Sequence, residues 1–507
     1  MREEPIVADP GRLIAMLFSS WYFILIFLPL TFAGYFLLNH LRLVSVAKVW
    51  LVSANLLFYG FWDYRYLPII ICSILFNFTI GGRINPQVAR VRYRLSHGAL
   101  LTCGIVANLL LLGYFKYVDF FIGNVNALIG SNYSFLSIAL PLGISFFTFQ
   151  QIDYLVDSYR GKTKEYRLLN YALFVTFFPH LIAGPIVHHD DIMSQLTSRW
   201  RWIVRYPYIL RGLFAFSIGL FKKVVIADTL ALWANWGFDQ SAELDFFSAW
   251  GTSLAYTFQL YFDFSGYCDM AIGAALLFNI WLPINFNSPY KALTIQDFWR
   301  RWHMTLSRFL RDYLYIPLGG NRGSDLRTCL SIMLTFSLGG LWHGASWLFV
   351  AWGALHGVAL VVQRTWSGIG WRMPKVVAWT MTFLFVNAGW VIFRAKRWED
   401  ARKVFYGMLD IRTAVSLPVA SIEVSHLAWG GFGMDTLLSI FPTGVAINFL
   451  LFVFLGAASF VLSRSNTFEM ARGEMTAWKV YGAIPLLSIG ILCAIASTSK
   501  VFLYFNF

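Results

Sequence analysis

Charged side chains are scarce in this chain. Of its 507 residues, 13% are charged and 58% are hydrophobic, whereas about 25% of residues are charged in ordinary soluble domains. Segments of alternating polarity, which mark an outer-membrane barrel, are missing. Apolar runs of about twenty residues, long enough to cross a bilayer as helix, recur instead. The sequence therefore predicts an all-α polytopic membrane protein with roughly ten to twelve spans.

Cysteine pairs and the signatures of soluble enzymes are also absent. The five cysteines are scattered, mostly in apolar surroundings and without a CxxC spacing, which excludes a zinc-ribbon pattern or a disulfide framework. The chain has no GxSxG elbow, Walker A loop, HExxH motif or kinase motif set, so the common soluble hydrolases and nucleotide-dependent enzymes are excluded. We expect no metal site and no bound cofactor.

Acidic residues are fewer than basic ones, and the net charge is +14. In a soluble protein this balance would indicate nucleic acid, but in a membrane protein the positive-inside rule explains it. Arg83, Arg90, Arg92 and Arg94 form one basic loop. A second basic segment contains Lys291, Arg300, Arg301, Arg308, Arg311, Arg322 and Arg327. We expect both in the cytoplasm, which places the N-terminus outside a multi-pass protein of the inner membrane, with no nucleic acid partner.

The chain reads as a single membrane domain over residues 16–507, because it contains no repeat and no low-complexity linker. The leader, residues 1–15, carries Glu3 and Glu4, and no small-residue cleavage site follows the first apolar run, so we expect no cleavable signal peptide. We expect residues 1–15 to be a loose extension before Met16. The last six residues, 502–507, form an aromatic tail.

Polar residues gather between Gln259 and His356. Asp263 and Asp269 interrupt an apolar run, and their spacing of six places them on different faces of a helix. They are candidates for substrate binding; the alternative is an ion pair with a neighbouring arginine that orients a helix. The segment Thr294–Arg311 is amphipathic and predicts a helix that lies in the membrane interface, or enters from it, rather than spanning.

His343 is the most informative single residue. It lies within an apolar run in Gly339-Gly340-Leu341-Trp342-His343-Gly344, and ionisable groups inside spans usually serve a reaction or a transport path. A neutral imidazole can take a proton from an attacking hydroxyl. His303, forty residues earlier, is its candidate partner. The alternative is a histidine that only bonds one helix to another, and the residues alone leave both interpretations open.

Other histidines give weaker signals. His180 lies between Pro179 and Pro185, which predicts a broken helix lining a cavity. His188 and His189 follow at an apparent helix end, where we expect them to be exposed. His356 is interpreted as structural.

Several ordered stretches carry a family likeness: Met16 to Ser20, Gly143 to Phe146, Tyr154 to Gly161, Pro179 to Pro185, Gln259 to Met270, Phe298 to Ser307, Arg311 to Gly323 and Gly339 to Gly344. In these stretches the chain resembles the membrane-bound O-acyltransferases. The likeness is to the bacterial branch that acetylates exported polysaccharides, nearest to its alginate O-acetylating members. The D-alanyl transfer proteins of teichoic acid are more distant relatives.

This resemblance implies helices around a thinned centre, with His343 as general base where a cytoplasmic donor tunnel meets an outward funnel. His303 falls on the family's second histidine position and would line the tunnel or position the acyl group. The donor would be a thioester, with acetyl-CoA favoured over a carrier-protein thioester. The candidate substrate-binding residues lie in the matching stretches: Trp342, Arg300, Arg301, Asn321, Asp263, Asp269 and His180.

The aromatic tail also resembles the terminal motif of this branch, in which a tyrosine accepts the acyl group. Tyr504 is therefore the third candidate catalytic residue; the alternative is an aromatic anchor at the membrane interface. The resemblance implies a partner that completes the transfer outside the membrane. This partner would be a periplasmic or membrane-anchored O-acetyltransferase or carrier within a polysaccharide synthesis complex. Membrane lipid would surround the protein. The alternatives are D-alanyl transfer to teichoic acid, a transporter of a small acyl metabolite or lipid, and a scaffold.

Overall fold

Helices form every regular element in the part of the chain that the computed structural model describes, namely residues 16–88, 96–163, 167–196, 198, 202–371, 373–415, 466–496 and 502–503. Six of its segments are long and apolar enough to cross a membrane: Phe23–His40, Val44–Ile84, His97–Lys116, Trp347–Ile369, Lys375–Arg394 and Ala477–Ile495. The segment Val44–Ile84 itself contains two long helices. The predicted all-α polytopic membrane fold is confirmed.

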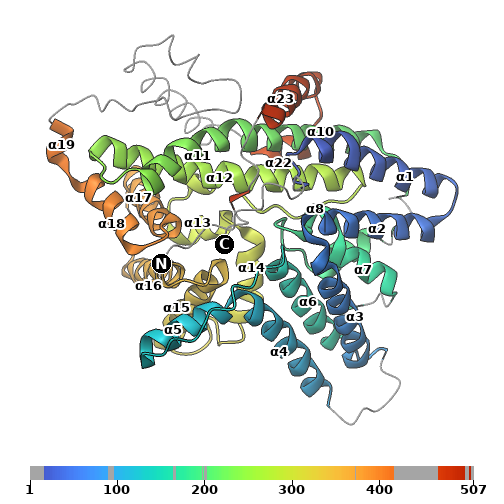
Figure 1. The fold of residues 1–507 in the computed structure, drawn as a ribbon, viewed down its shortest axis with the longest axis horizontal. Helices are drawn as coiled ribbons and strands as arrows, with labels where there is room; N and C mark the ends of the chain where they lie inside the picture. Colours follow the sequence, from blue (N-terminus) through green and yellow to red (C-terminus); the bar gives the residue numbers. More distant parts are fainter. Residues whose placement is uncertain are drawn as a thin grey trace.

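Helix α12 (Phe246–Leu277) forms the centre of the molecule. Most of its 32 residues are buried, as expected of a helix that is apolar all round. At 1.5 Å per residue it is about 48 Å long. Figure 1 shows α10 (Tyr206–Phe221) and α11 (Asp228–Asn235) lying along it.

Two groups of helices flank this centre, with α13 (Ile295–Arg301) and α14 (Met304–Leu310) between them, although α5 of the first group lies on the side of the second (Figure 1). The N-terminal group is η1 (Phe23–Phe27), α1 (Leu28–His40), α2 (Val44–Asp63), η2 (Tyr64–Tyr66), α3 (Leu67–Ile84), α4 (His97–Lys116), α5 (Val118–Ile129), α6 (Ile144–Tyr159) and α7 (Leu168–Thr176). The second group is α15 (Asp325–His343), α16 (Trp347–Ile369), α17 (Lys375–Arg394), α18 (Trp398–Leu409) and α19 (Ile411–Val415). The short elements are α8 (Phe178–Leu181), α9 (His189–Leu196), η4 (Lys222–Ala227), η5 (Trp236–Gln240), η6 (Pro289–Lys291), η7 (Arg311–Tyr315) and α22 (Thr467–Arg472); α23 (Ala477–Ala496) packs against α10.

Glycines let α15 and α16 approach closely. A Cβ at Gly340 would lie 2.1 Å from the Phe349 carbonyl oxygen, and one at Gly353 would lie 2.2 Å from that of Phe336. Only glycine fits both positions, as at many crossings of membrane helices. The apolar run around His343 is thus held directly against the following helix.

The predicted interfacial helix over Thr294–Arg311 is wrong in one respect, because the structure breaks it in two. Helix α13 (Ile295–Arg301) ends before Trp302, and α14 (Met304–Leu310) begins after His303. His303 has a φ of +43°, which is left-handed and uncommon for a residue other than glycine. The strained turn places the His303 side chain in the protein interior.

Candidate active site

The two candidate histidines lie together. His343 is the last residue of α15 and His303 immediately precedes α14. Their ring centroids are 6.4 Å apart, and both side chains are buried. The ring of His343 is enclosed by Trp342, Trp352 and Phe393, at centroid distances of 5.1, 5.2 and 5.3 Å. Two imidazoles within one apolar enclosure form the centre of the candidate site.

Asn285 fixes the protonated nitrogen of His303. Its side-chain Oδ1 accepts the backbone N–H of Thr305 at 3.3 Å and the Thr305 hydroxyl at 2.9 Å. A backbone N–H can only donate, so this atom is the oxygen of the amide. The same oxygen lies 3.0 Å from His303 Nδ1, and Nδ1 must therefore carry the proton. The opposite nitrogen, Nε2, then presents a lone pair.

The Trp342 side chain lies beside both histidines of the candidate site. Its ring lies 6.2 Å from that of His303 and stacks on Phe149 at 5.3 Å. The indole N–H is buried and has no hydrogen-bond partner within the described residues. A buried donor without a partner is costly, and a carbonyl oxygen of a bound molecule would satisfy it. Trp342, predicted to bind substrate, thus lies beside both histidines.

Lys116 is a part of the site that the sequence analysis missed. It ends α4, and its Nζ donates to the carbonyl oxygens of Trp342 at 2.6 Å and His343 at 3.3 Å. Nearby, the Tyr117 hydroxyl donates to the Leu341 carbonyl at 3.0 Å. An ammonium group at a helix C-terminus satisfies the last carbonyls and the helix dipole. In the sequence, Lys116 is simply a charge at the end of an apolar run.

We predict that Lys116→Met lowers both stability and activity. Methionine keeps the length of the side chain but leaves two carbonyls at the end of α15 without their donor, at a cost of about 1.5–3 kcal/mol. The midpoint of thermal unfolding in detergent should fall, and activity should fall several-fold. Lys48→Met is the matched control, because Lys48 donates to Asn170 of α7 at 2.7 Å. Full activity in Lys116→Met would contradict this role.

Asp263 and Asp269 bind lysines, so the predicted arginine partner is wrong. Lys222 and Lys223 begin η4, a π-helical turn. Lys222 lies 2.7 Å from Asp269, whereas Lys223 lies 2.8 Å from Asp263 and 2.6 Å from Asp228. Because the lysines are adjacent in sequence, both carboxylates of α12 join the same helix. These buried ion pairs hold η4 against α12. Asp263 also accepts a hydrogen bond from one further donor.

That donor comes from the end of the chain. The backbone N–H of Leu503 lies 3.1 Å from Asp263 Oδ2. Phe502 is buried, and its ring stacks on Tyr267 at 4.6 Å and lies 6.0 Å from Phe264. Phe264 in turn contacts His303 at 4.9 Å. The described part of the tail thus binds beside the site. Tyr504 lies outside the described residues.

Other predicted site residues lie apart from the histidines. His180 Nε2 is 2.8 Å from the Phe174 carbonyl oxygen. Arg300 is exposed, and Arg301 binds Asp297 at 2.9 Å. Asn321 accepts the Tyr315 hydroxyl at 2.6 Å, beyond the far end of α15, which is about 27 Å long from Asp325 to His343. None of these contacts brings its residue to His343.

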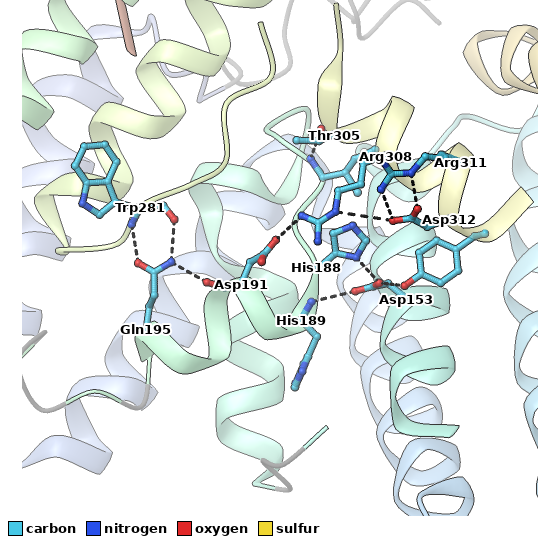
Figure 2. Close-up of polar contacts among 12 residues, drawn as sticks. Asp153, His188, His189, Asp191, Gln195, Trp281, Thr305, Arg308, Arg311 and Asp312 are labelled. Atoms are coloured by element: carbon cyan, nitrogen blue, oxygen red, sulfur yellow. Dashed lines mark hydrogen bonds and ion pairs between the residues drawn. The ribbon is translucent and has the colours of Figure 1, made fainter. Parts of the chain in front are cut away.

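His188 and His189 are buried, so their predicted exposure is wrong. His188 Nδ1 lies 2.6 Å from Asp153 of α6, whose other oxygen accepts the backbone N–H of His189 at 3.0 Å (Figure 2). Burial lowers the pKa of His188, but the hydrogen bond and charge of Asp153 outweigh it and raise this pKa above its ordinary value. The sequence shows the two histidines but not the aspartate, 35 residues earlier, that holds them.

Among the residues that the structure describes, no group of three or more histidine, cysteine, aspartate or glutamate side chains is arranged to hold a metal ion. Two buried imidazoles, an indole N–H and a tail that binds beside them suit proton transfer during attack on a carbonyl.

Comparison with known proteins points to one family. Residues 137–396 match the model of the membrane-bound O-acyltransferase family. The chain is 47% identical to the peptidoglycan O-acetyltransferase of Helicobacter pylori, with 98% of each chain covered. It is 40% identical to the probable alginate O-acetylase AlgI of Azotobacter vinelandii, over 83% of this chain and 85% of the relative. It is 28% identical to the teichoic acid D-alanyltransferase of Bacillus subtilis, over 50% of this chain and 69% of the relative.

Proposed function

Since this chain belongs to the membrane-bound O-acyltransferase family and is therefore a membrane acyltransferase, we propose that it takes acetyl from a cytoplasmic thioester and delivers it outward for O-acetylation of peptidoglycan. The proposed chemistry rests on one observation: the ring centroids of His343 and His303 are 6.4 Å apart in a buried enclosure. The polymer is inferred from the relatives, because identity is 47% to the peptidoglycan enzyme and 40% to the alginate one.

Basic residues support the proposed orientation. Arg308, Arg311, Arg322, Arg327 and Arg364 are exposed. The beginning of α15 joins α16 through an ion pair of 2.9 Å between Asp325 and Arg364. We assign this basic face to the cytoplasm of the inner membrane, by the positive-inside rule, and the N-terminus to the outside. The favoured donor, acetyl-CoA, carries phosphates that an arginine-rich face attracts.

In the proposed reaction His343 is the general base. Its imidazole takes the proton of an acceptor hydroxyl as the hydroxyl oxygen attacks the thioester carbonyl carbon. The C–S bond breaks, and the thiolate that leaves recovers the proton from the imidazolium. His303, with its lone pair at Nε2, positions the acyl group. The apolar enclosure excludes water, which would otherwise compete as acceptor.

Trp342 supplies a donor to the developing oxyanion in this scheme. We predict that Trp342→Phe lowers kcat about 10²-fold, because phenylalanine keeps an aromatic ring against Phe149 but lacks the indole N–H. KM for the donor should change less. Initial rates with acetyl-CoA measure both constants. Trp371→Phe, at an exposed tryptophan, is the control. A kcat equal to wild type would exclude the indole as a donor.

We propose that Tyr504 is the first acceptor. It follows Leu503 directly in sequence, and Leu503 is bonded to Asp263 beside the site. A phenol attacks poorly unless a base removes its proton, and the aryl ester that forms keeps much of its acyl-transfer potential. A partner outside the membrane, either an O-acetyltransferase or a carrier in the polysaccharide synthesis complex, would then pass the acetyl group to the glycan.

The experiment is complementation of a strain that lacks this protein, with O-acetyl groups on isolated peptidoglycan counted by mass spectrometry. Wild type should restore them and His343→Ala should not. Labelled acetyl-CoA and a labelled acetyl carrier protein, supplied separately to inverted membrane vesicles, identify the donor. Restoration by His343→Ala, or acetylation of another polymer with peptidoglycan unmodified, would refute the proposal.

A further inference from the structure

Asp153 collects three donors from two separate segments. Its Oδ1 accepts His188 Nδ1 at 2.6 Å and the hydroxyl of Tyr313, and its Oδ2 accepts the backbone N–H of His189 at 3.0 Å. Figure 2 shows the carboxylate facing His188 and His189. A buried carboxylate is costly unless it is this well paired. It joins α6 to the segment before α9 and to η7.

The proton positions in this cluster follow from the carboxylate, which can only accept. His188 Nδ1 and the Tyr313 oxygen must each carry a hydrogen. Burial and the charge of Asp153 raise the pKa of Tyr313, so the phenol remains a donor at neutral pH. The two hydrogens that face Asp153 therefore stay in place whether the His188 ring is neutral or charged.

The backbone before His188, followed by a series of hydrogen bonds, leads from this cluster to His303. Two residues before His188, the backbone N–H of Ile186 donates to the Thr305 hydroxyl at 3.0 Å. That hydroxyl donates to Asn285 Oδ1 at 2.9 Å, and the same oxygen lies 3.0 Å from His303 Nδ1. The segment Ile186–His188 thus connects the carboxylate of Asp153 to the residue that orients His303.

A second path leads to Trp342, the neighbour of His343. Tyr313, held by Asp153, packs on Phe309 with ring centroids 4.7 Å apart. Phe309 stacks on Phe149 at 4.0 Å, and Phe149 stacks on Trp342 at 5.3 Å. Thr305 stands at the start of α14, and Tyr313 follows its end. Both ends of the helix that carries these contacts are therefore tied to Asp153.

We propose that Asp153 is a positioning residue for the acetyl-transfer site, acting through His188 and Tyr313 on the two ends of α14 and so on His303 and Trp342. This inference rests on the proposed function. Asp153 touches neither histidine of the site, so its removal should misplace the catalytic groups without weakening donor binding.

The test is Asp153→Asn, measured by initial rates of transfer from acetyl-CoA with purified protein. Asparagine has the same size, but its amide nitrogen cannot accept one of the three donors. We expect kcat to fall about 10- to 100-fold, with KM for acetyl-CoA within about two-fold of wild type. Tyr313→Phe should show the same split if Asp153→Asn does not fold. Asp157→Asn is the matched control: it lies one turn further along α6 and pairs with Lys162 at 3.6 Å.

A double-mutant cycle separates positioning from general damage. Thr305→Val removes the hydroxyl between Ile186 and Asn285 and so breaks one of the two paths. Asp153→Asn should then lower kcat by a smaller factor in that background than in wild type, with the remaining loss passing through Tyr313. Losses that multiply, or a rise in KM with kcat unchanged, would overturn the positioning role. A wild-type protein that transfers no acetyl group would overturn the proposed function itself, which distinguishes the two failures.

Discussion

His343→Ala is expected to lower the rate of acetyl transfer at least about 10³-fold while leaving the protein folded. Removing a general base costs 10²–10⁴-fold, and His343 contributes packing through one ring among larger aromatic neighbours. Release of free thiol from acetyl-CoA measures the rate, and size-exclusion chromatography with thermal unfolding in detergent measures the fold. The loss should appear in kcat.

His356→Ala is the control for this prediction. His356 is also buried, and its Nδ1 accepts the indole N–H of Trp299 at 3.2 Å, so its loss should lower stability more than the rate of the chemical step. Equal losses in the two variants would mean that the enclosure needs its packing and that His343 has no special role.

Tyr504→Phe is expected to lower acetylation of the glycan about 10²-fold or more, although it removes a single oxygen atom. Under the relay this hydroxyl is the nucleophile, and phenylalanine retains the aromatic character of the tail. Mass spectrometry of O-acetyl groups on peptidoglycan from complemented cells measures the effect.

Tyr481→Phe provides the comparison, because Tyr481 of α23 is exposed and takes no part in the relay. Glycan acetylation should be unchanged there. Normal acetylation in Tyr504→Phe would leave the tail as an aromatic anchor and transfer the role of first acceptor to a partner.

The sequence predicts the membrane class, the family and the two histidines, but not the residues that hold the two histidines in place. The motifs around His303 and His343 can be recognised without knowledge of the tertiary structure, because each is a short continuous stretch of sequence. Lys116, Asn285 and Asp153 act on residues 226, 18 and 35 positions away, and no periodicity links such positions. His188 looked exposed because its partner, Asp153, lies within the apolar helix α6. The left-handed turn at His303 was missed because amphipathic periodicity continues through it.

The partners in the buried ion pairs also could not be predicted from the sequence. An aspartate in an apolar run requires a cation, and this much follows from Asp263 and Asp269. Which cation is supplied depends on how α10 and η4 pack along α12, and the packing selects Lys223 and Lys222. The contact of Asp263 with Leu503 joins positions 240 residues apart, so only the folded chain brings the tail to the site.

One measurement tests the central claim most directly: single-turnover transfer of label from acetyl-CoA to the purified protein, followed by hydroxylamine treatment and mapping of the labelled residue. The account predicts a hydroxylamine-labile acetyl group on Tyr504 in wild type and none in either His343→Ala or Tyr504→Phe. Labelling of His343→Ala at the wild-type rate would contradict the assignment of His343 as the base on which the proposed mechanism depends.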